Sequence, residues 1–206
     1  MIAIVDYGVG NLYSLTCSLR HIGVEARVTR DEAELRAAER IILPGVGAFG
    51  DAAGQLRALK LDGLLRELAG RGKPLMGVCL GMQLLFDRGL EYGVHEGLGL
   101  IRGQIVPLGP IAPGLKVPHM GWNSLDILKP DDPLMRGVRP GDYVYYVHSY
   151  CAQGCGEALV AASQYGVAVA GVVRSGNVCG TQFHPEKSGE VGLAILAAFA
   201  KGAASC

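Results

Sequence analysis

Short apolar runs alternate with helical patterns through the first half of the chain. Four strands are predicted, at residues 2–5, 24–28, 40–43 and 74–78. Between the first two, apolar residues recur at intervals of three and four from Leu12 to Ile22, which predicts an amphipathic helix that ends near Gly23. This alternation of strands and helices favours βαβ units and a parallel sheet.

Polar residues beside these runs indicate where the helices begin. Asn11 is placed to cap the first helix, and Asp31 with Glu34 resembles a capping box before a second, short helix. A single helix is expected to carry the leucines from Leu56 to Leu68. After Cys79 another helix is expected, packed through Met82, Leu84, Leu85 and Phe86.

The pattern changes after about residue 93. Glycine, proline and short alternating runs at 100–108, 122–128, 143–147 and 167–173 predict antiparallel strands and hairpins. A final helix is expected at about 189–201. No repeat or linker interrupts the chain, so residues 1–206 are predicted to form a single domain.

Charge and cysteine usage narrow the class of protein. The 19 basic and 19 acidic residues cancel, and no block of like charge occurs, which argues against a nucleic-acid or membrane-surface partner. Asp6 interrupts the first apolar run too early for a signal peptide. The six cysteines lack the spacing of a disulfide framework, so reduced thiols in a cytoplasmic protein are expected.

Cys79 lies where the fourth predicted strand meets a helix, between Gly77 and Gly81. Small neighbours at these positions permit a sharp strand-to-helix turn, as in the G-x-S-x-G elbow of hydrolases. A thiol at such a turn lies near a helix N-terminus, and the N–H of Leu80 is free to donate to an oxyanion. A buried core thiol is the equally weighted alternative for this stretch taken alone.

His184 and Glu186 provide what a thiol nucleophile needs. A histidine can act as base, and a carboxylate can fix its tautomer and balance its charge. Pro185 disfavours helix at His184, so an extended backbone is expected to point both side chains to one side. With this pair present, the interpretation of Cys79 as part of a Cys-His-Glu triad is strongly favoured over that of a core thiol.

The loop that follows the third predicted strand contains Gly45 and Gly47 on either side of Val46. These glycines let the peptide reorient and offer a second N–H to an oxyanion. An ordinary glycine-rich turn is the alternative, and it would be preferred without the triad.

The residues disfavour two other chemistries. Residues 6–11 follow the first strand like the start of a dinucleotide fingerprint, but Tyr13 stands where the third glycine belongs, which disfavours a nicotinamide-dependent oxidoreductase. His148, Cys151 and Cys155 lack the spacing of a zinc site.

Six motifs in order carry a resemblance to a known family. GVCLGMQ and TQFHPEKS resemble the class I (triad-type) glutamine amidotransferases. DYGVGNL, LPGVGAFGD, PHMGWN and YYVHSY are similar, more narrowly, to the glutaminase subunits of imidazole glycerol phosphate synthase, of histidine biosynthesis. The resemblance implies an α/β fold, a flavodoxin-like three-layer sandwich with a mainly parallel central sheet and a smaller antiparallel region.

The resemblance also implies the chemistry and its residues. Cys79 would attack the side-chain amide of L-glutamine, His184 would accept and return the proton, and Glu186 would orient the imidazole. Water would then release glutamate from a thioester, with ammonia as the other product. The implied oxyanion hole is Leu80 with a reoriented peptide at Gly45 and Val46. The implied substrate-binding residues are Gln83, His148, Ser149 and Tyr150.

The family pairs this subunit with a (β/α)8-barrel cyclase that receives the ammonia, and no cofactor or metal is implied. Trp122 suits an interface anchor, although a core tryptophan is at least as good an interpretation from the residues alone. Lys187 would reach the partner, and Asn11 would link docking to the oxyanion loop. A cysteine hydrolase for another amide and a non-catalytic scaffold are the competing interpretations; the full motif set disfavours the first and the intact triad the second.

Overall fold

The computed structural model describes residues 1–202. Its α-helices are α1 (Leu12–His21), α2 (Glu32–Ala37), α3 (Phe49–Ala58), α4 (Leu61–Gly70), α5 (Leu80–Gln83), α6 (Leu108–Ile111) and α7 (Gly189–Lys201). Its first seven strands are β1 (Ile2–Val5), β2 (Ala26–Thr29), β3 (Arg40–Leu43), β4 (Leu75–Val78), β5 (Phe86–Gly89), β6 (His95–Glu96) and β7 (Ile101–Pro107). The others are β8 (His119–Ser124), β9 (Asp126–Ile127), β10 (Tyr143–His148), β11 (Tyr150–Gln153), β12 (Leu159–Tyr165), β13 (Val167–Ser175) and β14 (Val178–Thr181). Three short 3-10 helices lie at Pro133–Met135, Gly156–Ala158 and Pro185–Lys187.

One large sheet forms the centre of the molecule. Its strand order is β2-β1-β3-β4-β14-β13-β12-β9, and the first five strands are parallel while the last three are antiparallel. The order 2-1-3-4 at the parallel end is that of flavodoxin-like sheets. The predicted α/β class is therefore confirmed, with a mixed central sheet.

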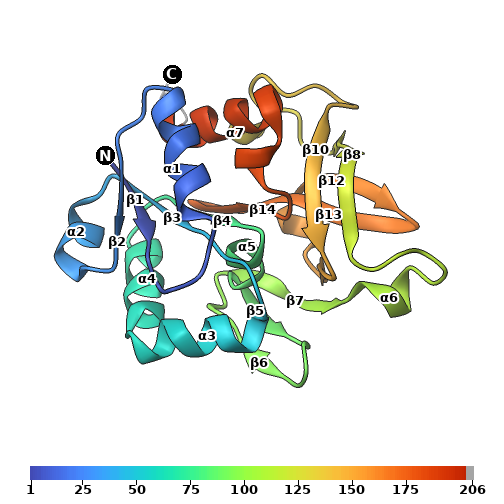
Figure 1. Ribbon diagram of the computed structural model, residues 1–206, viewed down its shortest axis with the longest axis horizontal. Coiled ribbons are helices and arrows are strands. Elements are labelled where there is room, and N and C mark those ends of the chain that lie inside the picture. The colour runs from blue at the N-terminus through green and yellow to red at the C-terminus, as the bar shows by residue number, and fades with distance from the viewer. Residues whose placement is uncertain (203–206) are drawn as a thin grey trace.

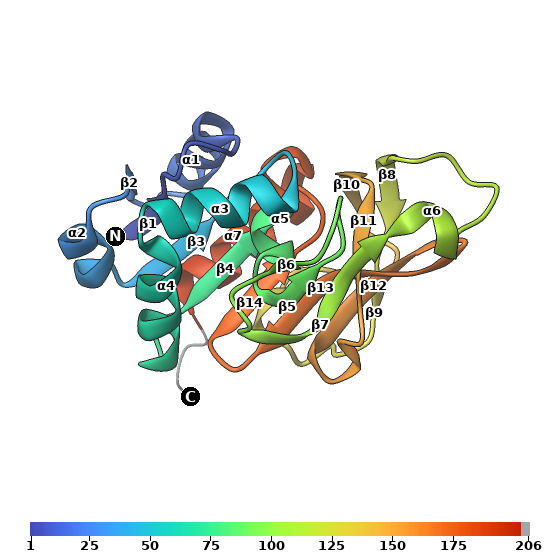
Figure 2. The ribbon, with the colours of Figure 1, turned by 90° about the horizontal axis from the view of Figure 1, so that it is seen from below.

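Alternate residues of the parallel strands face opposite helical layers. In β1, Ile2 and Ile4 belong to the core shared with α1 and α7, whereas Ala3 and Val5 belong to the core shared with α3 and α4. Both faces are covered, as Figures 1 and 2 show. This double burial explains why β1, β3 and β4 are almost continuously apolar, since parallel strands inside a sheet are buried on both sides.

Two smaller sheets hold the strands of the second half that do not join the centre. One has the order β11-β7-β5-β6, and the other is the pair β10-β8. The predicted antiparallel pairing is confirmed for β8 with β10 and for β7 with β11, but β5 and β7 run parallel. The smaller region is therefore mixed rather than antiparallel throughout.

Several predicted boundaries are wrong for local reasons. The side chain of Asn11 makes no cap hydrogen bond to α1. The second strand begins at Ala26 because Val24 N–H instead bonds Leu19 O at the end of α1. The single helix expected across 56–68 is two helices, because Lys60 has a φ of 57° and the chain turns there.

The capping box before α2 is half formed. Asp31 accepts a hydrogen bond from Glu34 N–H at 2.9 Å, as predicted. The Glu34 carboxylate does not return to the Asp31 N–H, because it pairs with Arg27 at 2.6 Å. The Asp31 N–H bonds the hydroxyl of Thr29 instead.

The helix after Cys79 is shorter than expected. It ends at Gln83, and Phe86 already belongs to β5. Met82, Leu84, Leu85 and Phe86 are nevertheless fully buried, so the packing role predicted for them holds although only Met82 packs from a helix.

Five cysteines within residues 1–202 are free thiols, and Cys206 lies among residues 203–206, outside the described part of the chain. None of the helices described between residues 1 and 202 is both long and apolar enough to span a bilayer.

Candidate active site

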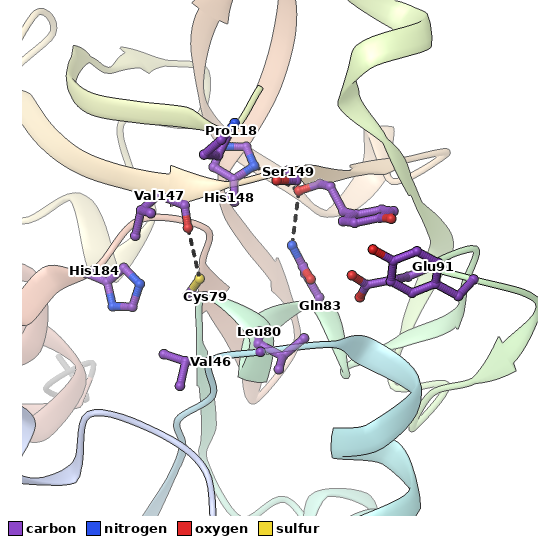
Figure 3. Close-up of a pocket in the computed structure, with 13 residues that line it drawn as sticks. Val46, Cys79, Leu80, Gln83, Glu91, Pro118, Val147, His148, Ser149 and His184 are labelled. Carbon is purple, nitrogen blue, oxygen red and sulfur yellow. Dashed lines mark hydrogen bonds between the residues drawn. The ribbon is translucent and has the colours of Figure 1, made fainter. Parts of the chain in front are cut away.

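A cavity of about 470 Å³ opens where three neighbouring parallel strands end. The loop after β3 contributes Val46 and Gly47, the turn after β4 contributes Cys79, and the segment after β14 contributes His184. The other lining residues are Leu80, Gln83, Glu91, Tyr92, Pro118, Val147, His148, Ser149 and Tyr150. In Figure 3 the Cys79 sulfur lies between His184 on one side and Gln83 on the other, close to Val147, while Glu91 lies farther away beyond Gln83.

Cys79 occupies a strained turn. Its φ of 53° and ψ of −111° lie in a region that residues with a Cβ rarely adopt. Hydrogen bonds hold the turn on both sides, because Cys79 N–H donates to Thr181 O at 2.8 Å and Cys79 O accepts from Gln83 N–H at 3.1 Å. The turn presents a thiol that is only 6% exposed to the cavity.

The glycines around Cys79 serve close packing as much as backbone freedom. A Cβ on Gly81 would lie 1.9 Å from Leu43 O, and one on Gly77 would lie 2.5 Å from Met82 Cα. Gly180 of β14, which the sequence pattern did not single out, would place a Cβ 2.4 Å from Met82 Cγ. These three glycines let α5 sit directly on the ends of the strands.

His184 and Glu186 form a buried hydrogen-bonded pair. His184 Nδ1 lies 2.8 Å from Glu186 Oε1, and the two side chains are 3% and 2% exposed. The expected extended backbone is found at His184 only, because Glu186 lies in the 3-10 helix Pro185–Lys187. His184 N–H donates to Tyr145 O at 3.0 Å, which ties the segment to β10.

The surroundings of His184 favour the imidazolium. Burial alone would lower the pKa of His184, but its hydrogen bonds with Cys79 and Glu186 and their negative charges outweigh burial and raise the pKa to about 10. The second carboxylate oxygen, Glu186 Oε2, is buried and has no hydrogen-bond partner among residues 1–202. The carboxylate is thus aimed at the imidazole alone.

Two backbone segments lie next to the Cys79 sulfur. Leu80 is the first residue of α5, so its N–H has no acceptor within the helix. Val46 and Gly47 line the cavity, and Gly47 has a φ of 100°, whereas Gly45 is buried behind them. A Cβ on Gly45 would lie 2.8 Å from Gly81 N, so the loop after β3 touches the elbow.

Gln83 is held in the wall of the cavity. Its Nε2 donates to Tyr150 O at 3.0 Å and to Gln182 Oε1 at 3.1 Å. The Nε2 of Gln182, another residue the sequence pattern did not single out, lies 3.9 Å from the Cys79 sulfur. A chain of amide contacts therefore runs from Tyr150 to the thiol.

His148, Ser149 and Tyr150 line the cavity where β10 passes into β11. Both ring nitrogens of His148 are engaged within the protein, with Tyr150 O at 2.8 Å and with His119 at 2.9 Å. The groups that this stretch can offer a ligand are thus its backbone and the hydroxyl of Ser149.

Glu91 and Tyr92 line the cavity from the loop after β5, and sequence reasoning missed both. Glu91 Oε2 accepts a hydrogen bond from Phe49 N–H at 2.6 Å, which fixes the carboxylate at the cavity. No spacing pattern around residues 90–94 marks an acidic ligand residue, and the motifs behind the resemblance do not include this loop.

The residues expected at an interface lie outside the cavity. Trp122 is 56% exposed and its ring lies 6.0 Å from that of Tyr145, which excludes the alternative of a core tryptophan. Lys187 is exposed with its Nζ 5.8 Å from the centre of the Tyr145 ring. Asn11 precedes α1 and follows Gly10, where a Cβ would lie 3.0 Å from Pro44.

The cysteines of the 151–155 stretch are both buried, and burial raises the pKa of Cys151 to about 11. Across residues 1–202, no three His, Cys, Asp or Glu side chains gather in a way that could hold a metal ion.

Solved structures share this fold. A crystal structure of a glutamine amidotransferase superposes with a TM-score of 0.75 at 20% identity, covering 97% of this chain and 99% of that one. The structure of PurLQS from Thermotoga maritima gives a TM-score of 0.75 at 24% identity, covering 96% of each chain.

Sequence comparison narrows the family. Residues 3–202 match the class I glutamine amidotransferase family. The imidazole glycerol phosphate synthase subunit HisH of Oceanobacillus iheyensis is 49% identical over 95% of this chain and 96% of its own. HisH of Listeria innocua is 48% identical over 100% of this chain and 98% of its own, and HisH of Bacillus subtilis 48% over 99% and 97%. The chain therefore belongs to the class I glutamine amidotransferases and, among these enzymes, to the HisH subunits of imidazole glycerol phosphate synthase.

Proposed function

We propose that the chain hydrolyses L-glutamine to glutamate and ammonia through a thioester on Cys79. The proton of the Cys79 thiol is held by His184, whose raised pKa keeps the ring as an imidazolium at neutral pH, and the sulfur attacks the side-chain amide carbon of glutamine. His184 returns the proton to the departing amide nitrogen, so ammonia leaves and a γ-glutamyl thioester remains. Water then attacks the thioester with His184 as base, which releases glutamate and restores the thiol.

The pair His184–Glu186 supports this assignment of roles. Because Nδ1 of His184 is engaged with Glu186, Nε2 is the nitrogen left for the thiol proton. The raised pKa of His184 means that the imidazolium formed by the first proton transfer is stable beside the thiolate. Glu186 balances that charge and keeps the ring in place.

The tetrahedral intermediate needs donors for its oxygen anion. We assign one to Leu80 N–H, at the start of α5, and a second to the peptide at Gly45–Val46 after it reorients. Gly47, with its φ of 100°, is the point about which this loop can turn. On this assignment, the second donor is in place only after the peptide turns.

Substrate recognition is assigned to the opposite wall. Gln83, Ser149 and the backbone from His148 to Tyr150 hold the glutamine side chain and its α-carboxylate. The Glu91 carboxylate, fixed at the cavity by Phe49 N–H, is the group suited to the α-ammonium. The cavity of about 470 Å³ accommodates a ligand of this size.

We further propose that the ammonia passes to a (β/α)8-barrel cyclase subunit, so that the pair forms imidazole glycerol phosphate synthase in histidine biosynthesis. The relatives are named as subunits of that enzyme. The face that carries Trp122 and Lys187 is the assigned docking surface, since an exposed tryptophan of this kind is typical of interface hot spots.

The observation that carries the proposal is the thiol of Cys79 held in a strained turn beside the His184–Glu186 pair. The test is to measure glutamate release from glutamine by the chain alone and by the chain in complex with the cyclase subunit and the ligand of that subunit. We expect fast turnover in the liganded complex and slow turnover by the chain alone, because docking turns the Gly45–Val46 peptide. Equal turnover in the two conditions would contradict this activation, and no turnover in either would contradict the function.

A further inference from the structure

Two buried histidine rings touch each other behind the cavity. His119 and His148 are opposite residues of β8 and β10, and their exposed fractions are 3% and 6%. His119 Nδ1 lies 2.9 Å from His148 Nε2. Neither ring takes part in the chemistry proposed above.

The groups at the two ends of this pair determine where its hydrogens lie. His148 Nδ1 lies 2.8 Å from Tyr150 O, and a carbonyl only accepts, so this nitrogen carries a hydrogen. In a neutral ring the other nitrogen, Nε2, is then an acceptor, and His119 Nδ1 must donate to it.

The far end agrees. His119 Nε2 is then an acceptor too, and it lies 3.2 Å from the Asn123 amide nitrogen, which only donates. The orientation of that amide is set independently, because Asn123 Oδ1 accepts from Ser124 N–H at 2.9 Å and Asn123 Nδ2 donates to Gln164 O at 3.0 Å. One arrangement of hydrogens satisfies every contact, and it requires both rings to be neutral.

The surroundings keep the rings neutral. Burial lowers the pKa of His119 and of His148 to about 4 in each case. His119 stacks between the rings of Tyr146 and Tyr165, at centroid distances of 4.6 and 4.0 Å.

The inner end of the chain of contacts is the oxygen that holds Gln83. Tyr150 O accepts from both His148 Nδ1 and Gln83 Nε2, so the histidine fixes one side of this oxygen and the glutamine uses the other. Gln83 in turn bonds Gln182, whose amide nitrogen approaches the Cys79 sulfur. A shift of His148 therefore moves the wall of the substrate site.

The outer end of this chain of contacts lies on β8, the strand that carries Trp122 of the proposed docking surface. Successive residues of a strand point to opposite faces, so β8 turns His119 and Asn123 inward while Met120 and Trp122 point outward, 61% and 56% exposed. One strand thus presents Met120 and Trp122 to a partner on one face and holds the buried network through His119 and Asn123 on the other.

From this juxtaposition we propose that His119 and His148 are positioning residues, which set the Tyr150 oxygen that orients Gln83 and couple the conformation of β8 to glutamine binding. This rests on the proposed function. The network itself can be tested without any activity, so the two ideas can fail separately.

The first experiment is to record two-bond ¹H–¹⁵N correlation spectra of the full chain with labelled histidine at pH 7. The chain has five histidines, and spectra of His21→Gln and His95→Gln variants simplify the assignment. We expect His119 and His148 both to be neutral with their hydrogen on Nδ1. A cationic ring or a hydrogen on Nε2 at either residue would overturn the proposal.

The second experiment compares His119→Phe with His119→Asn in the complex with the cyclase subunit. Phenylalanine keeps the stacked ring but has no donor, whereas asparagine keeps an amide N–H near the position of Nδ1. Loss of one buried hydrogen bond predicts a KM for glutamine about tenfold higher in His119→Phe, with kcat within about threefold of the parent. His119→Asn restores KM to within about threefold of the parent.

A purely structural role would lower the folded fraction and so the apparent kcat, without changing KM. His21→Gln, at the end of α1, serves as the control that keeps the parental KM. An unchanged KM in His119→Phe, or equal KM values in the two His119 variants, would contradict the positioning role.

Discussion

Cys79 N–H donates to Thr181 O at 2.8 Å, so the last residue of β14 holds the turn that carries the thiol. Val78 and Thr181 are paired residues of the parallel strands β4 and β14. This pairing brings the end of one strand, with Cys79, beside the segment after the other, with His184. Two residues far apart in the sequence meet because their strands are neighbours.

Replacing Glu186 by Gln tests whether the carboxylate of the His184–Glu186 pair is needed for its proposed role. The amide cannot balance the imidazolium, so we expect the pKa of His184 to fall and kcat for glutamine to drop at least about a hundredfold. The pKa is measured by histidine ¹⁵N titration and kcat in the complex with the cyclase. Glu190→Gln, on the first turn of α7, is the matched control. A parental kcat in Glu186→Gln would contradict the role assigned to Glu186.

The raised pKa of His184 predicts a pH dependence of stability. The folded state holds the proton up to about pH 10, whereas the unfolded chain releases it near the ordinary value of 6.5. The contribution is therefore complete below about pH 6.5, decreases as the pH rises toward 10 and is absent above it. We expect the difference in unfolding free energy between the parent and His184→Gln to shrink over this range in urea titrations. A difference that grows with pH would contradict this assignment.

Gly81→Ala tests the close packing of the elbow. The added Cβ would meet Leu43 O at 1.9 Å, so the backbone must shift, and we expect a loss of about 2–3 kcal/mol or more in unfolding free energy. Gly54→Ala is the matched control in α3, where a Cβ meets nothing within 4 Å, and we expect a gain of up to about 1 kcal/mol. Urea denaturation midpoints measure both. Equal midpoints would show that the elbow tolerates a side chain.

Trp122→Ala tests the assigned docking surface. We expect the Kd for the cyclase subunit to rise about thirtyfold, equivalent to about 2 kcal/mol, because a half-exposed tryptophan is the strongest anchor available there. Unfolding of the isolated chain should change little. Val28→Ala, an exposed apolar residue on β2 at the opposite edge of the central sheet, should leave the Kd unchanged. The Kd is measured by titration calorimetry. An unchanged Kd in Trp122→Ala would show that the interface lies elsewhere on the chain.

Local patterns predicted the parallel half of the fold well. The strands β1, β3 and β4 and the helix α7 lie where apolar runs and helical spacing place them, because each element is buried continuously or on one face. The break between α3 and α4 was missed, since no glycine or proline marks it and the turn is made by Lys60 at a positive φ. The length of α5 was also missed, because an apolar run does not show where helix passes into strand.

In the candidate site, too, some positions could be predicted from local sequence patterns and others could not. The proximity of Cys79 to the His184–Glu186 pair could be predicted, because the residue types and their flanking glycines and proline are typical of a catalytic triad. The positions of Glu91, Gln182 and His119 at or behind the cavity could not be predicted, because each depends on a contact that only the folded chain creates. His119 reaches the cavity wall through the register of β8 with β10, and no spacing in the sequence reports that register.

The central claim is that Cys79 is the nucleophile, and covalent labelling tests it most directly. The complex is incubated with a glutamine-derived electrophile, and the modified cysteine is identified by peptide mass spectrometry. We expect modification of Cys79, suppressed by excess glutamine and lost in His184→Ala, with the half-buried Cys17 unmodified as an internal control. Labelling confined to another cysteine, or glutamine hydrolysis that persists in Cys79→Ala, would contradict the account.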